Sequence, residues 1–164
     1  MSYYLVKSHA KINMALNVVG RSNSLHRIES IVRFLELHDE IKIKKINSIK
    51  HMINFTGKFS REIKSNNTIS KLLYNFEKKK LLKHKYQIII KKDIPSKAGL
   101  GGGSMNAASI LNFFIKKKLI RLKKKEIIKI SNSIGSDVFL GLSSKNLILN
   151  KNNQIKNFYK RNEF

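Results

Sequence analysis

The sequence predicts a fold that combines β-strands with α-helices, and three features carry this prediction. Residues 11–19 alternate polar with apolar side chains, which is the pattern of a strand with one buried face. Residues 68–76 repeat apolar side chains at the spacing of one helical face. Residues 86–90 form a short β-rich run, which a glycine-rich loop connects to a helical run at residues 107–115. A strand, a glycine loop and a helix in series are typical of folds that bind phosphate groups.

The first predicted strand separates its side chains into two rows. We expect the apolar row to be half-buried; it consists of Ile12, Met14, Leu16 and Val18. Lys11 and Asn13 lie two residues apart and therefore point the same way from the other face. From the spacing alone, the simplest interpretation of this pair is an ordinary solvated sheet face.

The segments between this strand and the glycine loop are shorter. Residues 20–26 form a turn-rich loop by composition, and residues 27–35 fit either a strand or a helix. Residues 41–44 alternate like an edge strand, and residues 52–56 predict another strand that ends at a glycine turn.

The helical segments have recognisable boundaries. Asn67 is placed to cap the helix at residues 68–76, which we expect to pack its apolar stripe into the core. Residues 123–130 predict another helix, which we expect to stop at residues 131–133 and Gly135. Residues 147–155 are typical of a hairpin.

The glycine loop spans residues 95–106 and contains half of the chain's eight glycines and its only proline. Glycine lets a ligand approach the backbone, and the first N–H groups of the following helix favour an anion. We expect Ser104 to cap that helix. A merely flexible linker fits less well, because helix-forming residues follow directly. The spacing of the glycines matches neither the Walker A pattern nor the dinucleotide fingerprint.

Length and composition bound the remaining possibilities. A chain of 164 residues suits one domain, and the absence of cysteine excludes disulfides and thiolate metal sites. No stretch reaches the roughly 20 apolar residues of a membrane span. We therefore expect a cytoplasmic protein with no membrane partner.

The formal net charge of +24 would attract any polyanion. The excess is mostly lysine in short runs, and aromatic side chains are not interleaved with these runs as stacking platforms. A drift in composition explains the pattern better than a selected nucleic-acid interface, which leaves nucleic acid as a less favoured partner.

The motif at residues 95–104, Pro-x-x-x-Gly-Leu-Gly-Gly-Gly-Ser, resembles the ATP loop of the galactokinase, homoserine kinase, mevalonate kinase and phosphomevalonate kinase superfamily. Its continuation, Ser-x-Asn-Ala-Ala, is similar to the 4-diphosphocytidyl-2-C-methyl-D-erythritol kinase family within it. The resemblance implies ATP and Mg²⁺ as cofactors, with Ser104 as a possible contact of the metal. The nucleotide contacts it implies are Ser96, Lys97, Ala98, Gly99, Leu100, Gly101, Gly102, Gly103, Ser104, Met105 and Asn106.

Two further motifs carry catalytic expectations. Residues 10–13, Ala-Lys-Ile-Asn, match the family's opening motif, which implies that Lys11 lies beside the reacting groups and that Asn13 contacts the substrate. Residues 135–138, Gly-Ser-Asp-Val, resemble its catalytic motif, which makes Asp137 the implied general base. Without the resemblance, an aspartate after a glycine is more often a turn or cap residue.

The resemblance also assigns a substrate site. His26 matches the histidine that holds the cytosine of 4-diphosphocytidyl-2-C-methyl-D-erythritol, whereas Leu25 replaces the tyrosine that stacks on this base. The implied reaction is phosphorylation of the substrate's 2-hydroxyl in the synthesis of isoprenoid precursors.

The implied fold is α+β, the ribosomal protein S5 domain 2-like N-terminal domain of these kinases, with residues 1–164 as a single ATP-binding domain. The resemblance covers nearly the whole chain, but the family continues into a second domain. We therefore expect weak activity unless a separate chain or self-association supplies the missing half. The alternatives are a basic nucleotide- or RNA-binding module and an inactive remnant.

Overall fold

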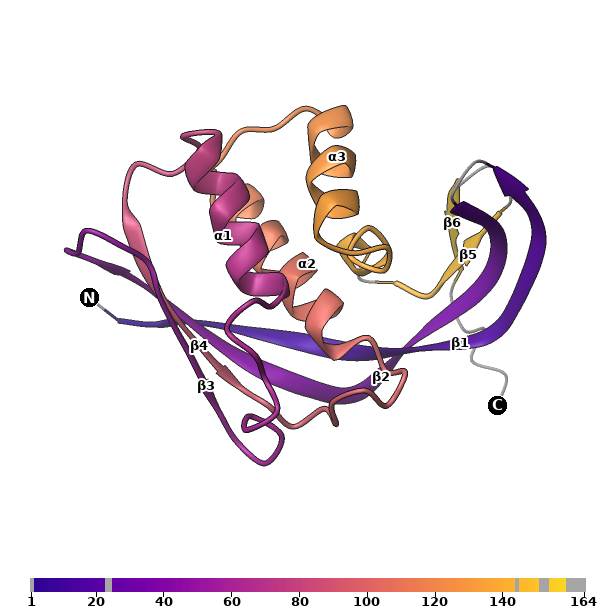
Figure 1. Ribbon diagram of the computed structural model, residues 1–164, viewed down its shortest axis with the longest axis horizontal. Helices are drawn as coiled ribbons and strands as arrows, with labels where there is room; N and C mark the ends of the chain where they lie inside the picture. The colour runs from indigo at the N-terminus through magenta and orange to yellow at the C-terminus, as the bar shows by residue number, and fades with distance from the viewer. Residues whose placement is uncertain (1, 23–24, 144, 151–153, 159–164) are drawn as a thin grey trace.

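The computed structural model describes residues 2–22, 25–143, 145–150 and 154–158. The described part contains one six-stranded sheet and three α-helices (Figure 1). In chain order the elements are β1 (Tyr4–Ser22), β2 (Leu25–Ile46), β3 (Met52–Thr56), α1 (Thr68–Lys78), β4 (Lys85–Lys91), α2 (Gly102–Lys116), α3 (Lys124–Ile134), the short 3-10 helix η1 (Leu140–Leu142), β5 (Leu147–Leu149) and β6 (Ile155–Asn157). The α+β fold is thereby confirmed, and residues 27–35 are strand rather than helix.

Strand β2 is the centre of the sheet, whose order is β3-β4-β2-β5-β6 with β1 paired along β2. Only β3 and β4 pair in parallel. Residues 40–43 of β2 pair with both β1 and β4, so the prediction of an edge strand at residues 41–44 is wrong. Ile41 and Ile43 are completely buried there, because both neighbours and the helices cover them.

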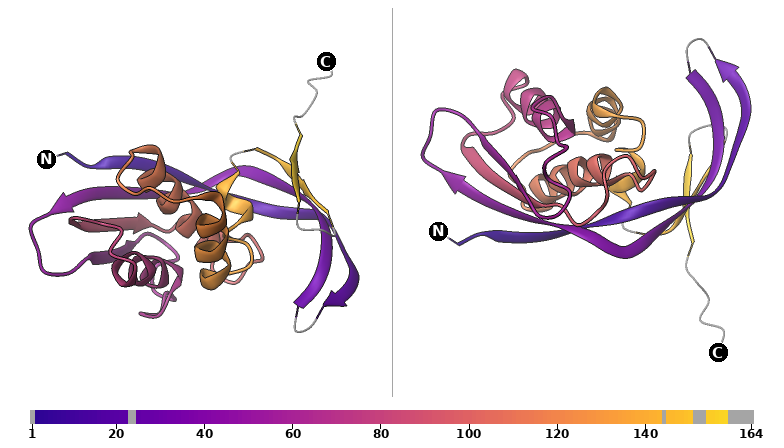
Figure 2. Two further views of the ribbon diagram at one scale, coloured as in Figure 1. Left: turned by 90° about the horizontal axis from the view of Figure 1, so that it is seen from above. Right: turned by 60° about the horizontal axis from the view of Figure 1, so that its bottom comes forward.

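Strand β1 is confirmed and longer than predicted, but its apolar row is not buried. Met14, Leu16 and Val18 are more than half exposed. The pairing of β1 with β2 shifts register three times, at bulges that break the strict alternation of faces. The β1–β2 ribbon also extends sideways past the helices (Figure 2), so the described part of its far end lies beyond the area that they cover.

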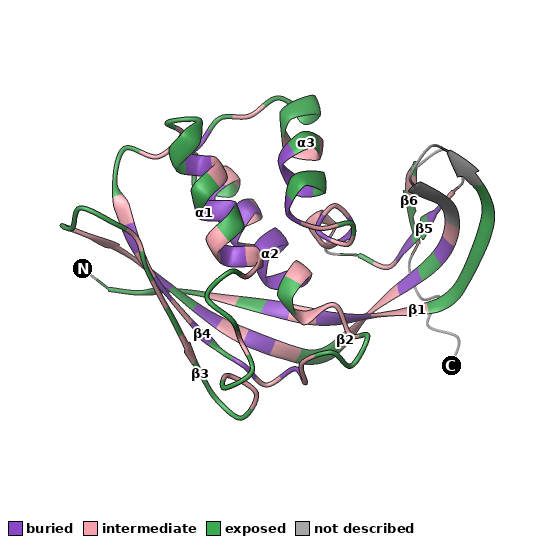
Figure 3. Cartoon of the chain, in the orientation of Figure 1, coloured by how far each residue is buried: buried purple, intermediate pink, exposed green. Residues whose placement is uncertain are grey.

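The core lies between the sheet and the three helices, which stand on one face of it (Figures 1 and 3). Phe76 of α1, Tyr86 of β4 and Phe114 of α2 meet edge to face at its centre, with ring centroids 4.9–5.5 Å apart. Burying each phenylalanine contributes roughly 1.5–3 kcal/mol. These contacts pack the C-terminal parts of α1 and α2 against the sheet, at the end of α2 that is opposite the glycine loop.

The ends of the helices follow partly from the sequence. Asn67 caps α1 as predicted, and its side chain accepts hydrogen bonds from the N–H groups of Ile69 and Ser70. Helix α3 does not stop at residues 131–133, but continues to Ile134 and ends at Gly135, the other stop signal that the sequence offers. Ser131 and Ser133 donate to backbone carbonyls within the helix instead of interrupting it.

The C-terminal hairpin is confirmed as the antiparallel pair β5 and β6. Among the described residues, no helix combines the length and the apolar character that crossing a bilayer requires.

Candidate active site

The glycine loop connects β4 to α2, as predicted, and adopts an unusual backbone. Lys97, Gly99 and Gly101 have positive φ angles of 58°, 73° and 67°. Gly101 is the residue that caps α2, in the left-handed conformation and without a side-chain hydrogen bond. The prediction of Ser104 as the cap is therefore wrong, because the helix begins at Gly102 and Ser104 lies in its first turn. The first N–H groups of α2 have no partner within the helix and are available to an anion.

A cavity of about 370 Å³ opens on this loop. Its lining consists of Glu62, Ile63, Lys64, Asn67, Thr68, Lys92 and all ten residues from Pro95 to Ser104. Nine of the eleven predicted nucleotide contacts thus surround one cavity. The other two, Met105 and Asn106, are only 2% and 1% exposed and direct their side chains elsewhere, Met105 toward Gly141 and Asn106 toward Asp39.

Lys11 and Asp137 come together from opposite ends of the sequence. The Nζ atom of Lys11 lies 2.9 Å from the Oδ2 atom of Asp137 and donates a hydrogen bond of 2.6 Å to Asn13 Oδ1. The side chain of Lys11 is 8% exposed, whereas that of Asp137 is 32% exposed. The pair therefore offers a solvent-accessible carboxylate next to a buried cation, and the polar face of β1 is not an ordinary solvated surface.

The ion pair is attached directly to the glycine loop. The N–H of Lys11 donates to the carbonyl of Leu100 over 3.0 Å. A Cβ atom at Gly101 would lie 2.8 Å from Cε of Lys11, so glycine is required for this close approach. The loop and the two charged groups consequently form one continuous site.

Asn13 is held in place behind Lys11. Its amide donates 2.9 Å to Ser30 Oγ, which in turn donates 2.8 Å to the carbonyl of Ala15. This chain of hydrogen bonds directs Asn13 Oδ1 toward Lys11. The predicted substrate contact His26 and its neighbour Leu25 have side chains outside the described residues.

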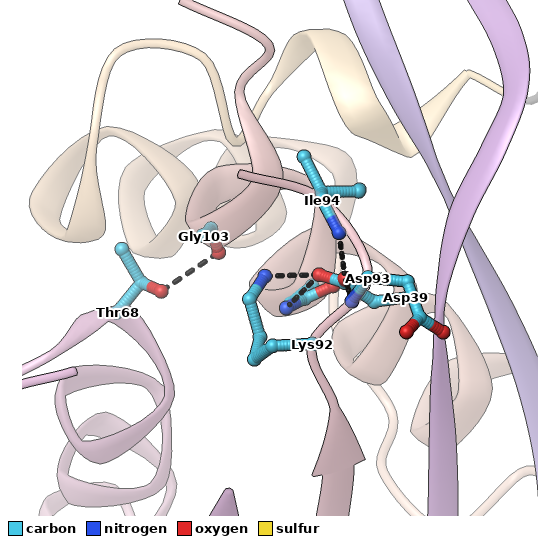
Figure 4. A network of polar contacts seen from close by, with 7 residues as sticks. Asp39, Thr68, Lys92, Asp93, Ile94 and Gly103 are labelled. Carbon is cyan, nitrogen blue, oxygen red and sulfur yellow. Dashed lines mark hydrogen bonds and ion pairs between the residues drawn. The ribbon is translucent and has the colours of Figure 1, made fainter. Parts of the chain in front are cut away.

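Sequence reasoning missed a buried charged network beside the loop (Figure 4). Asp39 of β2 is fully buried, and its carboxylate accepts from Lys92, from Asn106 and from the N–H groups of Asp93 and Ile94. The alternation of inward and outward side chains along β2 and β4 could have indicated this network. Asp39 continues the inward row of Ile41 and Ile43, and Lys92 continues that of Ile88 and Ile90, so opposite charges occupy core positions.

The site fits a nucleotide. The hydroxyl of Ser96 is buried without a partner among the described residues, although it lines the cavity. Lys92 adds a cation to the same wall. The described residues contain no cluster of three or more His, Cys, Asp or Glu that could hold a metal ion.

The chain resembles known proteins in sequence. The family model described as "GHMP kinases N terminal domain" matches residues 67–145. The chain is similar to a protein of Pelagibacter ubique named 4-diphosphocytidyl-2-C-methyl-D-erythritol kinase, with 54% identity over 100% of this chain and 59% of that protein. A protein of the same name from Fusobacterium nucleatum is 35% identical over 88% of this chain and 50% of its own length.

Solved structures show the same fold. A crystal structure of 4-(cytidine 5'-diphospho)-2C-methyl-D-erythritol kinase superimposes with a TM-score of 0.71 at 22% identity, over 94% of this chain and 55% of that one. A mevalonate kinase from Staphylococcus aureus gives 0.61 at 15% identity, over 96% and 55%. The chain spans about half the length of the curated relatives it matches.

Proposed function

Because the chain is similar to the N-terminal domain of GHMP kinases, we propose that it belongs to this family and takes part in ATP-dependent phosphorylation of 4-diphosphocytidyl-2-C-methyl-D-erythritol. In this proposal residues 1–164 form one ATP-binding domain. The observation that carries it is the junction of the glycine loop with the Lys11–Asp137 pair. A phosphate cradle and a candidate proton acceptor lie side by side there.

The glycine loop binds the phosphates of ATP in this proposal. The N–H groups at the start of α2 point along the helix axis, and the helix dipole adds partial positive charge at the same place. Ser96 would direct its unpartnered hydroxyl to the nucleotide. Residues 96–104 bind mainly through the backbone. Met105 and Asn106 support the loop from inside the protein instead, because their side chains are buried and the N–H of Met105 already donates to the carbonyl of Gly101.

Lys11 and Asp137 divide the chemistry of the transfer. The carboxylate of Asp137 accepts the proton of the 2-hydroxyl while that oxygen forms its bond to the γ-phosphorus of ATP. The bond from the γ-phosphorus to the bridging oxygen breaks, and ADP leaves with the electron pair. Lys11 neutralises charge on the transferring group, and its burial strengthens that interaction. A positioned base of this kind contributes about 10²–10⁴ in rate.

Magnesium, when bound, would neutralise phosphate charge and orient the γ-phosphoryl group. The hydroxyl of Ser104, on the cavity wall in the first turn of α2, is the protein group placed to contact it.

The acceptor lies on the side of Asn13 and His26 in this proposal. Asn13 Nδ2 already donates to Ser30. Its remaining hydrogen-bonding capacity would orient the acceptor alcohol beside Lys11. In this proposal the base is held less tightly than in the family, because leucine replaces the stacking tyrosine at position 25; a lost base–aromatic stack costs roughly 1–3 kcal/mol.

The test is a choice between acceptors. The purified chain is incubated with MgATP and, separately, with 4-diphosphocytidyl-2-C-methyl-D-erythritol, mevalonate or homoserine, and products are identified by phosphorus NMR. We expect a new phosphomonoester only on the 2-hydroxyl of the first compound. Transfer to mevalonate or homoserine instead, or to none of the three, would contradict the proposal.

A further inference from the structure

Asp39 stands out because a fully buried carboxylate is costly. It lies on β2, at the centre of the sheet, with no exposed surface. Removing a carboxylate from water costs several kcal/mol unless its partners compensate. Asp39 has four hydrogen-bond donors around it. Its Oδ1 atom accepts from the N–H groups of Asp93 and Ile94, both at 2.8 Å. Its Oδ2 atom accepts from Asn106 Nδ2 at 2.9 Å and from Lys92.

All four donors flank the glycine loop. Lys92, Asp93 and Ile94 directly precede Pro95, where the loop begins, and Asn106 lies near the start of α2, where it ends. Figure 4 shows these groups converging on one carboxylate. A single side chain of β2 therefore ties both ends of the loop to the central strand.

The loop itself is poorly suited to hold a fixed shape. It contains four glycines and three residues with positive φ, including the non-glycine Lys97. Its middle is attached by the hydrogen bond from Lys11 N to the carbonyl of Leu100, and its end by the bond of 2.7 Å from Thr68 Oγ1 to the carbonyl of Gly103. Glycine-rich backbone has high conformational entropy, so ordering it requires external contacts.

Neighbouring positions of the same strands show that sheet pairing alone does not need a charge. The next inward positions pair Ile41 with Ile90 and Ile43 with Ile88, and all four side chains are completely buried. Replacing a buried ion pair by apolar side chains is often neutral or stabilising. The charged pair Asp39 and Lys92 lies where β2 and β4 reach the loop. Its position therefore indicates a role in holding the loop and not in pairing the strands.

We propose that Asp39 is a positioning residue that preorganises the glycine loop for phosphate, by fixing both loop ends and by holding Lys92 at the cavity wall. It contacts neither nucleotide nor acceptor. Because preorganisation lowers the entropy that binding must remove, the loop binds phosphate more tightly with Asp39 than without it. This inference rests on the proposed function only for its effect on nucleotide affinity.

The experiment compares Asp39→Asn with Phe76→Leu, a core change remote from the loop that controls for lost stability. Amide hydrogen exchange is followed in the free proteins, and a non-hydrolysable ATP analogue with Mg²⁺ is titrated into each. For Asp39→Asn we expect exchange to accelerate about tenfold or more at residues 93–106, and analogue binding to weaken by a similar factor. Phe76→Leu should leave analogue binding unchanged, and it should accelerate exchange at residues 93–106 no more than in the rest of the chain.

Equal exchange at residues 93–106 in the two variants would overturn the inference. If the unchanged chain does not bind the analogue, the proposed function fails, while the exchange comparison in free protein still decides the role of Asp39. If Asp39→Asn yields no folded protein, Asn106→Ala replaces it. That variant keeps the pair of Asp39 with Lys92 and should loosen residues 101–106; unchanged exchange there would likewise overturn the inference.

Discussion

Lys11 illustrates how the neighbours of one residue determine its electrostatic surroundings. Its ammonium group is buried and contacts two oxygens, those of Asn13 and Asp137, while its N–H supports the loop through Leu100. A cation in such surroundings interacts more strongly with nearby negative charge than it would in water. The same residue therefore supports the shape of the loop and the charge of the site.

The change Asp137→Asn tests the division of roles between the loop and the ion pair. The amide keeps the size and polarity of the side chain but cannot accept the hydroxyl proton. We expect phosphoryl transfer to fall about 10²–10⁴-fold, with the affinity for an ATP analogue changed little. Transfer is measured under saturating substrates and affinity by calorimetry. A loss of nucleotide affinity equal to the loss of rate would assign Asp137 to binding rather than to proton transfer.

His51 provides a prediction about pH at the other end of the sheet. Burial lowers the pKa of His51 below its ordinary 6.5, against the opposing effect of Glu77, and its Nδ1 atom accepts from Tyr86 N–H. The unfolded chain therefore binds the proton more readily than the folded one. The stabilising contribution of the neutral imidazole is complete above about pH 6.5 and is lost as the pH falls through the lowered value.

Urea unfolding at about pH 7.5 and about pH 5.5 measures this contribution. We expect the wild-type chain to lose more stability on acidification than the His51→Asn variant, whose side chain can still accept from Tyr86. An identical loss in both chains would mean that another group carries the pH dependence.

At the scale of residues, the motifs around Lys11, Asp137 and the glycine loop could each be recognised, because each motif is one short continuous run of the sequence. Asp39 and Lys92 could not, because their meaning depends on how β2 pairs with β4. Once that pairing is known, both prove to continue inward rows of isoleucine, and a charge in such a row signals a buried network.

Among the elements, the glycine loop shows most clearly how backbone conformation and side-chain contact act together. Gly99 and Gly101 have similar positive φ angles, so an alanine at either position strains the backbone to a similar degree. Their surroundings differ. A Cβ atom at Gly99 would meet nothing within 4 Å, whereas one at Gly101 would collide with the side chain of Lys11.

This difference predicts the outcome of two matched substitutions. We expect Gly101→Ala to lower the free energy of unfolding by about 1–3 kcal/mol more than Gly99→Ala, which is the usual cost of overpacking. Urea unfolding of both variants measures the difference. Equal destabilisation would show that strain at φ, and not the approach of Lys11, determines the need for glycine at position 101.

Helices and strands could be predicted where the apolar side chains keep a regular spacing and the capping residue directly precedes the element. Helix α1 and its capping residue Asn67 are an example. Elements were misjudged where tertiary structure decided. The apolar row of β1 is exposed because the ribbon leaves the core, and α3 passes through its serines because their hydroxyls bond within the helix.

On the scale of the whole molecule, the sheet brings two ends of the sequence to one point. Strand β1 contributes Lys11, the turn after α3 contributes Asp137, and the glycine loop before α2 is hydrogen-bonded to Lys11 beside them. The net charge of +24 adds a long-range attraction for anions that does not depend on this geometry. Binding of a nucleotide is therefore informative only when its place on the molecule is known.

The most direct measurement of the central claim is an amide NMR spectrum recorded while a non-hydrolysable ATP analogue with Mg²⁺ is added. If the loop and the ion pair form one nucleotide site, the largest shift changes will occur at residues 99–104 and at the N–H of Lys11. Changes spread over the lysine-rich runs, with the loop unaffected, would contradict the account and identify a general binder of polyanions instead.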